Sequence, residues 1–417
     1  MAKRVLIVGA GIVGLSTALW AAREGLDVTL VDEGAPDGDG CSYGNAGMIV
    51  PSHFIPLAAP GMVARGLKWM WNPESPFYIR PRLDRDLLTW GLRFVCSANA
   101  GHVASSAPLL SALHRASRAI FEEWADEWGD AFGLTRRGLL MLCRTEHGFR
   151  EEAGVAARAR AMDIPAEILG AGEVAALEPG LRLDVAGAVR YPMDCHLTPS
   201  RLMAALRDAV ERAGVTLSWR TPVTGFVVTR GNVAAARAGG AEVQADEFVL
   251  CAGVWSTGLA RGLGLRLPME AGKGLSMTLE APRRLPVHCA LLSEAHVAVT
   301  PMGGTLRVGG TMELAGLDRS VTPARVRGIV RAMTRYLPDF TYADFAGVPV
   351  WSGLRPCSPD GLPYLGRLAR FTNVSVATGH AMMGVSLGPI TGRLMADVLC
   401  RRTPSLDIAA LSPNRYA

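Results

Sequence analysis

The fold of this chain is decided by its N-terminal stretch, Val5-Leu6-Ile7-Val8-Gly9-Ala10-Gly11-Ile12-Val13-Gly14. The continuous apolar run at its start predicts a buried parallel strand. The three glycines have separate uses: Gly9 allows a tight turn, Gly11 lets the backbone approach a pyrophosphate, and Gly14 lets the next helix pack closely on the strand. The N-terminus of that helix then faces the phosphate groups.

The residues after this stretch complete a dinucleotide-binding βαβ unit. A helix is expected from Leu15 to Glu24, where Gly25 ends it, and a second strand is expected from Val28 to Val31. Asp32 follows that strand, in the position where an acidic side chain accepts a hydrogen bond from a ribose hydroxyl. These residues alone leave FAD and NAD both open as the cofactor.

Composition and charge exclude several classes of protein. The 43 Lys and Arg residues exceed the 38 Asp and Glu residues only slightly and form no basic stripe, so we expect no nucleic-acid partner. The eight cysteines make no C-x-x-C pair and the eight histidines make no H-x-x-x-H cluster, which is typical of a reduced cytoplasmic protein without a metal site. Because the fingerprint begins at residue 5, we expect no signal peptide.

Membrane contact is expected to be peripheral if it occurs. No apolar run reaches the ~18 residues that a membrane span needs. The segment Gly66–Trp71 places two tryptophans beside Lys68, a combination found at membrane interfaces. A buried hairpin or helix edge is the favoured interpretation because the apolar stretch is short. The expected location is the cytoplasm, with peripheral contact at the inner face of the cell membrane left open.

Helical and strand-like segments alternate beyond the βαβ unit. Six prolines between residues 51 and 81 exclude long helices there. Apolar spacing and capping residues predict helices over 86–96, 108–128, 146–162, 199–213 and 388–399. Short alternating runs predict strands over 215–219, 225–229, 233–237, 247–250, 276–280, 296–300, 305–309 and 374–378, with residues 301–304 joining two of them as a hairpin.

The order of these elements predicts two interleaved domains in an α/β fold. A chain of 417 residues is too long for one compact core. A strand–glycine–helix unit stands at each end, with antiparallel material between, so we expect a discontinuous Rossmann-like domain and an α+β substrate domain on a mainly antiparallel sheet. The expected nucleotide-binding segments are 1–55, 194–265 and 351–417, and the expected substrate-domain segments are 56–193 and 266–350.

Four further motifs, in order along the chain, carry a resemblance to a known family. They are Cys41-Ser42-Tyr43-Gly44-Asn45-Ala46-Gly47-Met48, residues 248–256 ending in Ala-Gly-Val-Trp-Ser, residues 351–363, and Ala377-Thr378-Gly379-His380 followed by Gly384 and Gly388–Gly392. Together with the N-terminal fingerprint they resemble the FAD-dependent D-amino-acid oxidase superfamily, and most closely glycine oxidase and the bacterial D-amino-acid dehydrogenases. The resemblance implies that the discontinuous domain binds FAD.

The same resemblance implies an activity. Flavin-dependent oxidation moves a hydride from the α-carbon of an amino acid to the flavin and leaves an imine. Residues 42–61 and 71–78 are similar to the branch that oxidises D-hydroxyproline, which implies cis-4-hydroxy-D-proline or D-proline as substrate. A broad D-amino-acid dehydrogenase, a glycine or sarcosine oxidase, and a flavin-bearing electron-transfer subunit of a larger complex stay open. So do quinone or oxygen as electron acceptor, and a homo- or hetero-oligomeric state.

Arg355 is the first candidate for a substrate-binding residue. It matches the arginine of the Gly-Leu-Arg-Pro motif that binds the substrate carboxylate in the resembling enzymes, and a guanidinium fork fits a carboxylate bidentately. A structural ion pair between domains is the alternative. The other candidates for contact with substrate or flavin are His380, His296, His53 and Tyr43.

The resemblance also implies which residues hold FAD, and that the flavin is not covalently linked. Cys357 stands beside the flavin motif, but the sarcosine oxidases place their flavin-linked cysteine earlier, where this chain has Gly353. The implied cofactor-binding residues are Gly9, Gly11, Ile12, Val13, Gly14, Asp32, Glu33, Ser42, Asn45, Ala46, Gly47, Met48, Val223, Ala252, Gly253, Trp255, Gly353, Arg355, Gly379, His380, Gly384, Val385 and Ser386.

Overall fold

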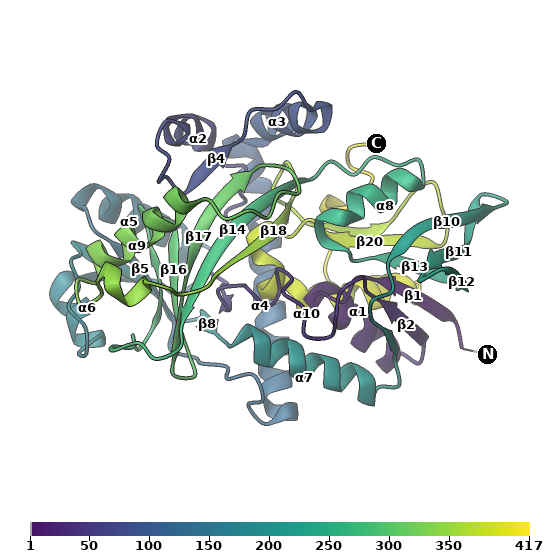
Figure 1. The fold of residues 1–417 in the computed structure, drawn as a ribbon, viewed down its shortest axis with the longest axis horizontal. Coiled ribbons are helices and arrows are strands. Elements are labelled where there is room, and N and C mark those ends of the chain that lie inside the picture. Colours follow the sequence, from purple (N-terminus) through teal and green to yellow (C-terminus); the bar gives the residue numbers. More distant parts are fainter. Residues whose placement is uncertain (1) are drawn as a thin grey trace.

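The computed structural model describes residues 2–417, and two large sheets dominate it (Figure 1). The first sheet is six-stranded, in the order β19-β20-β13-β1-β2-β9. β1 (Arg4–Val8) lies inside it and pairs in parallel with β2 and β13. The other strands are β2 Asp27–Val31, β9 Thr216–Ser218, β13 Glu247–Leu250, β19 Tyr364–Arg367 and β20 Val374–Thr378. The predicted Rossmann-like sheet is therefore present, and it is assembled from distant segments of the chain.

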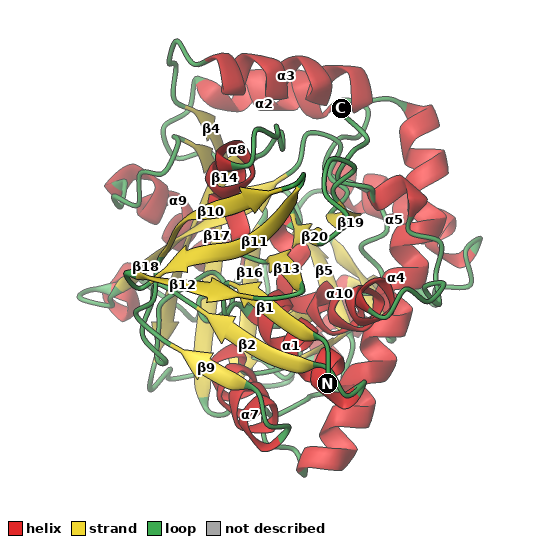
Figure 2. Cartoon of the chain, turned by 90° about the vertical axis from the view of Figure 1, so that its right-hand side faces the viewer, coloured by secondary structure: helices red, strands yellow, loops and turns green. Residues whose placement is uncertain are grey.

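Steric contacts explain why this βαβ unit needs its glycines. Gly9 has φ +107°, and a Cβ there would lie 2.6 Å from the carbonyl oxygen of Cys251. A Cβ on Gly14 would lie 1.8 Å from the carbonyl oxygen of Gly9. The absence of both side chains lets α1 (Ile12–Arg23) pack closely on the sheet, beside α10 (Gly384–Leu399) in Figure 2.

The second sheet is nine-stranded and mainly antiparallel, as predicted. Its order is β18-β14-β17-β16-β15-β5-β7-β6, with β4 paired to β17. Only the β5–β15 and β4–β17 pairs are parallel in this sheet. The strands are β4 Phe77–Ile79, β5 Leu139–Cys143, β6 Glu167–Gly170, β7 Gly187–Tyr191, β14 Glu270–Leu279, β15 Cys289–Leu292, β16 Val297–Met302, β17 Thr305–Leu314 and β18 Val350–Cys357.

Helices and two small sheets complete the fold. The β3–β8 ribbon and the β10-β11-β12 sheet are the small ones. Their strands are β3 Met48–Ile49, β8 Cys195–His196, β10 Val223–Thr229, β11 Asn232–Ala238 and β12 Ala241–Gln244. The remaining α-helices are α2 Met62–Met70, α3 Arg85–Ser97, α4 Ala100–Trp128, α5 Glu146–Arg160, α6 Ala171–Leu177, α7 Pro199–Arg212, α8 Ser256–Gly262 and α9 Pro323–Tyr336. α2 and α3 lie side by side at one edge of the molecule in both views (Figures 1 and 2).

Several element boundaries differ from the sequence prediction; β14 begins at Glu270 and not at residue 276, and β17 runs on from residue 309 to Leu314. α4 begins at Ala100 and not at Pro108, because the Asn99 side chain accepts a hydrogen bond from His102 N and caps the helix before the proline. β16 runs on through Met302, so the hairpin turn to β17 is Gly303–Gly304, both with positive φ. α10 begins at Gly384, before the predicted residue 388.

The strand that carries Arg355 belongs to the second sheet. β18 pairs antiparallel with β14 over eight residues, from Val350 opposite Met277 to Cys357 opposite Glu270. The predicted boundary at residue 350 therefore stands at the start of a substrate-sheet strand, after which the chain crosses to β19 in the first sheet. The domain boundaries themselves stay a prediction.

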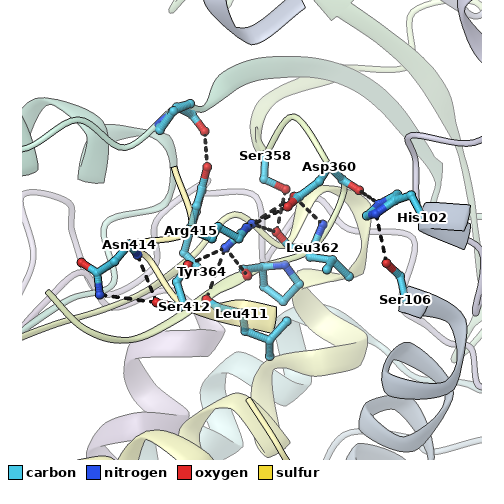
Figure 3. A network of polar contacts seen from close by, with 12 residues as sticks. His102, Ser106, Ser358, Asp360, Leu362, Tyr364, Leu411, Ser412, Asn414 and Arg415 are labelled. Atoms are coloured by element: carbon cyan, nitrogen blue, oxygen red, sulfur yellow. Dashed lines mark hydrogen bonds and ion pairs between the residues drawn. The ribbon is translucent and has the colours of Figure 1, made fainter. Parts of the chain in front are cut away.

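The C-terminal residues clamp the loop that follows β18 (Figure 3). Arg415 forms an ion pair with Asp360 at 2.7 Å and lies 3.9 Å from the ring centroid of Tyr364. Burial raises the pKa of the Asp360 carboxyl, but hydrogen bonds and charge from Arg415 outweigh it and hold that pKa below its usual value. His102 of α4 contacts the Asp360 carbonyl oxygen at 2.8 Å. The end of the chain thus fixes the loop between the two sheets.

Candidate active site

One large cavity extends between the two sheets, with a volume of about 2100 Å³. Its lining comes from the start of α1, the loop after β2, the segment before β3, and strands β14 to β18 of the second sheet. A cavity of this size and shape has room for a dinucleotide and a small substrate together.

The N-terminus of α1 fits a pyrophosphate. Gly11 is its N-cap with no side-chain cap bond, and the first turn carries no acidic residue. A Cβ on Gly11 would meet only Ser42 Oγ, at 3.5 Å, so the backbone is open to the cavity. Ser42 Oγ accepts a hydrogen bond from Ile12 N at 3.0 Å, which leaves the hydroxyl proton for a phosphate oxygen. The unpaired amides and the helix dipole both favour an anion here.

Asp32 lies at the cavity end of β2. Its carboxylate accepts hydrogen bonds from Ala10 N and Gly34 N, both at 2.6 Å. Each oxygen retains a lone pair for a ribose hydroxyl, so the residues present fit the adenosine half of FAD.

The loop before β3 is fixed by a charged residue that the sequence analysis missed. Arg307 of β17 donates from Nη1 to the carbonyl oxygens of Tyr43 and Asn45, at 2.7 and 2.9 Å. Burial lowers the pKa of this guanidinium, and the negative charge of Glu280 opposes that shift only in part. Arg307 therefore shapes the loop that carries the implied flavin contacts. The Tyr43 hydroxyl donates to the Pro36 carbonyl oxygen at 2.8 Å and holds the same loop.

Arg355 lies in the cavity without an acidic partner. Its guanidinium covers Gly274 of β14, where a Cβ would lie 2.0 Å from Nη1. Nη1 donates to the Thr311 carbonyl oxygen at 2.8 Å. Burial lowers its pKa, and within residues 2–417 the only groups that oppose this are the thiols of Cys41 and Cys357. The structural ion pair considered above is therefore absent from the described residues, and Nε and Nη2 are free for a bidentate carboxylate.

The candidate histidines lie in different surroundings. His296 has φ +52° and lines the cavity with its ring 5.1 Å from that of Trp69, edge to face. His380 also lines the cavity, but its Nε2 lies 2.9 Å from Thr391 Oγ1 of α10. Burial lowers the pKa of both imidazoles to about 4, so both rings are neutral. His53 lines the cavity and contacts Ser52 through Nδ1.

Most implied site residues meet in this one cavity, although their roles stay predictions. Four implied cofactor residues lie behind its wall: Gly14 packs on Gly9, Gly47 on the Leu197 carbonyl oxygen, Gly379 on Tyr364, and Ser386 contacts Val50 N and His114. Those on the cavity surface are Gly9, Gly11, Ile12, Val13, Asp32, Glu33, Ser42, Tyr43, Asn45, Ala46, Met48, His53, Val223, Ala252, Gly253, Trp255, His296, Gly353, Arg355, His380, Gly384 and Val385.

A second set of cavity residues belongs to no sequence motif. Met141, Leu291, Ala298 and Gly309 stand opposite one another on four successive strands and form an apolar row. Residues this far apart in sequence are aligned by strand register alone. Gly274 likewise could not be recognised from sequence, because it leaves space for Arg355 only through the pairing of β14 with β18.

A dinucleotide-type βαβ unit whose cavity continues to a guanidinium without an ion pair fits an oxidoreductase that holds FAD beside a carboxylate substrate. Residues 4–398 match the family model described as FAD dependent oxidoreductase, and the chain belongs to this family. Its cofactor is FAD.

Relatives and solved structures agree with this family. A protein named D-amino acid dehydrogenase from Granulibacter bethesdensis is 33% identical over 423 residues, which cover 99% of this chain and all of the relative. One of the same name from Bradyrhizobium diazoefficiens is 30% identical, with 99% of each chain covered. The crystal structure of glycine oxidase from Geobacillus kaustophilus is 26% identical and superposes with a TM-score of 0.79 over the whole of both chains.

Purified protein is expected to be yellow and to release its flavin on acid precipitation. The Cys357 thiol packs against Gly272, 2.8 Å from where a Cβ would stand, and is fully buried. Burial raises the pKa of this thiol to about 12, so no thiolate is available for a flavin linkage. Absorbance of the supernatant after precipitation measures the outcome. Colour retained in the pellet would contradict noncovalent binding and direct attention to Cys41, which does line the cavity.

Proposed function

We propose that this protein oxidises a D-amino acid, and that its preferred substrate is a cyclic secondary amino acid, cis-4-hydroxy-D-proline or D-proline. The free guanidinium of Arg355 in the cofactor cavity is the observation that carries the proposal. The names of the two relatives described above support the D-amino-acid class. A broad D-amino-acid dehydrogenase, a glycine or sarcosine oxidase, and an electron-transfer subunit are the alternatives.

Substrate recognition begins at the carboxylate. Nε and Nη2 of Arg355 form a fork for its two oxygens, while the bond to Thr311 holds the guanidinium on Gly274. Since the cavity is a low-dielectric environment, this charged pair fixes the substrate strongly. With the carboxylate held by Arg355 and the amino group held at a second place in the cavity, one enantiomer turns its α-hydrogen toward the flavin side and the other turns its side chain there.

The rest of the cavity suits a compact, weakly polar side chain. Met141, Leu291 and Ala298 supply an apolar surface, and His296 adds a neutral polar edge. When bound, FAD accepts the hydride from the substrate α-carbon. The protein contributes the carboxylate clamp, the shape of the cavity, and exclusion of bulk water from it.

Arg355→Ala is expected to keep FAD and to lose about 3–5 kcal/mol of transition-state stabilisation, the range for breaking a buried ion pair. Arg355→Lys should recover only part, because an ammonium cannot replace the fork. Steady-state kcat/KM and the flavin content measure the two effects. Arg182→Ala, at an exposed ion pair with Asp339, is the matched control and should behave as wild type. Unchanged kcat/KM in the Arg355→Ala protein would assign this arginine to structure.

The substrate preference is tested by anaerobic flavin bleaching with a panel of amino acids. Reduction should be faster with cis-4-hydroxy-D-proline and D-proline than with D-alanine or glycine, and L-proline should be inert. A highest kcat/KM for D-alanine would favour the broad dehydrogenase. A highest value for an L-amino acid would reject the stereochemical argument from Arg355.

We also propose peripheral contact with an anionic membrane through an apolar α2–α3 face, made of Leu67, Trp71, Leu83, Leu88, Leu92 and Val95. Trp71 is 91% exposed, and Leu88, Leu92 and Val95 follow one side of α3. Exposed Arg65, Lys68 and Arg85 accompany them, which suits anionic headgroups. Arg65, Lys68 and Trp69 of α2 also line the cavity, so a quinone in the membrane would meet its mouth. Among residues 2–417, no helix is both long and apolar enough to cross a bilayer.

Cosedimentation with phosphatidylglycerol vesicles tests this face. The double variant Leu88→Glu, Leu92→Glu should stay in the supernatant while wild type sediments, because charged side chains oppose insertion. Val228→Glu, at an exposed apolar position of β10 away from α2 and α3, is the control and should sediment as wild type. If all three proteins sediment equally, or if none of them sediments, the α2–α3 face is not a membrane contact.

A further inference from the structure

A chain of buried polar groups leads from the protein interior to the cavity at His53. Ser52 Oγ lies 2.5 Å from Asp194 Oδ2, and Ser52 N donates to Asp194 Oδ1 at 3.0 Å. On its other side, Ser52 Oγ lies 3.0 Å from His53 Nδ1. Asp194 is completely buried, whereas the His53 side chain reaches the cavity surface.

The β3–β8 ribbon brings this chain together. Met48 pairs with His196 and Ile49 with Cys195, in antiparallel register. The residues just beyond the paired ones, Asp194 on one side and Ser52 on the other, therefore come into contact. The ribbon continues from the same loop that Arg307 fixes, so the flavin loop and the Asp194–Ser52–His53 chain form one connected segment.

A buried carboxylate at this place contributes little to stability. No cation lies within ion-pair distance of Asp194 in the described part of the chain, and Arg118 contributes only a more distant charge. Burial raises the pKa of Asp194 to about 7, although the two bonds from Ser52 oppose the shift. A neutral amide would satisfy Ser52 without the desolvation cost of a charge. The ionisable side chain of Asp194 is therefore better explained by a function than by stability.

The direction of the hydrogen bonds indicates this function. A serine hydroxyl has one proton, and with Asp194 ionised that proton goes to the carboxylate. Ser52 Oγ must then accept from His53 Nδ1–H. A neutral imidazole with Nδ1 protonated has its lone pair on Nε2, the nitrogen that has no hydrogen-bond partner among residues 2–417.

Few other titratable groups face this histidine. His114 of α4 is the imidazole beside it, with Nδ1 3.0 Å from Ser386 Oγ of α10. Burial lowers the pKa of His114 to about 3 and that of His53 to about 4, so both rings are neutral in the free enzyme. Asp194 is the group in this cluster whose charge changes near neutral pH.

We infer that Asp194, acting through Ser52, sets the tautomer of His53 so that Nε2 accepts a proton from the substrate ammonium group. The inference rests on the proposed function, since it requires an amino-acid substrate. An N–H bond of the ammonium breaks and an Nε2–H bond forms. The amine lone pair then becomes the C=N bond as the hydride leaves the α-carbon for FAD. Burial disfavours the resulting imidazolium, so His53 carries the proton only transiently while the hydride leaves. During that time its Nδ1–H donates to Ser52 Oγ beside the negative charge of Asp194, and the proton then passes to water.

The pH dependence has a definite sign. Below its pKa, Asp194 is protonated and donates to Ser52 Oγ, so the serine proton turns to His53 Nδ1 and Nε2 becomes the protonated nitrogen. Nε2 can then no longer accept, and flavin reduction slows as the pH falls through about 7.

Anaerobic stopped-flow reduction by D-proline over about pH 6–10 tests the inference in the FAD-loaded enzyme. Asp194→Asn and Ser52→Ala should each slow reduction about 10²-fold near neutral pH, the usual contribution of a general base, and recover at alkaline pH where the free amine is available. Binding of 2-furoate, a ring carboxylate with no N–H to give, should be unchanged in both. Glu178→Gln, at the buried pair with His288 outside the cavity, is the control for loss of a buried carboxylate and should keep the wild-type profile.

A second readout does not depend on turnover. In protein with ¹⁵N-labelled histidine, the nitrogen shifts of His53 should report Nδ1–H in wild type at alkaline pH and Nε2–H after Asp194→Asn. The inference would be overturned if the pH profiles of Asp194→Asn and Ser52→Ala had the same shape as the wild-type profile. An Nε2–H tautomer of His53 in wild type at alkaline pH would overturn it as well. If no amino acid of the panel reduces the wild-type flavin, the proposed function fails, whereas the tautomer measurement still decides the role of Asp194.

Discussion

The unpaired guanidinium of Arg355 is the constraint on which the account of this site depends. A half-buried cation without a carboxylate costs free energy in the folded protein. Nη1 of Arg355 donates to the Thr311 carbonyl oxygen, and Gly274, which has no side chain, leaves room for the guanidinium. Arg319, at the edge of the cavity, is paired with Asp39, whereas no carboxylate among residues 2–417 contributes a charge that opposes the lowered pKa of Arg355. The charge at Arg355 is therefore available for a ligand, and a carboxylate is the group that fits its fork.

The two sheets divide the work of binding. The first sheet presents the N-terminus of α1 and Asp32 at the ends of its parallel strands, where the dinucleotide belongs. The second presents β18 and its neighbours, which carry Arg355 and the apolar row. Arg307 connects the two halves, because a residue of the second sheet holds the backbone of the flavin loop. The C-terminal ion pair of Arg415 with Asp360 fixes the segment by which the chain crosses from the second sheet to the first.

The sequence was most informative where one local segment determines the chemistry. The fingerprint from Val5 to Gly14 predicted its strand, helix and close packing, because each glycine acts on neighbouring backbone. Strand register was beyond such reasoning, so the row of Met141, Leu291 and Ala298 did not emerge from it. Asp194 was missed for the same reason, since only the β3–β8 pairing brings it to Ser52. The start of α4 was misplaced because Pro108 outweighed the Asn99 cap in the sequence pattern.

The central claim is that Arg355 is reserved for a carboxylate, and the most direct measurement compares two ligands that differ only in that charge. Titration of the oxidised, FAD-loaded enzyme with 2-furoate and with 2-furamide, followed by the change in flavin absorbance, gives both dissociation constants. The account predicts that 2-furoate binds at least about 100-fold more tightly, the size expected from loss of a buried charge-assisted pair. Equal affinity for the acid and the amide would contradict it.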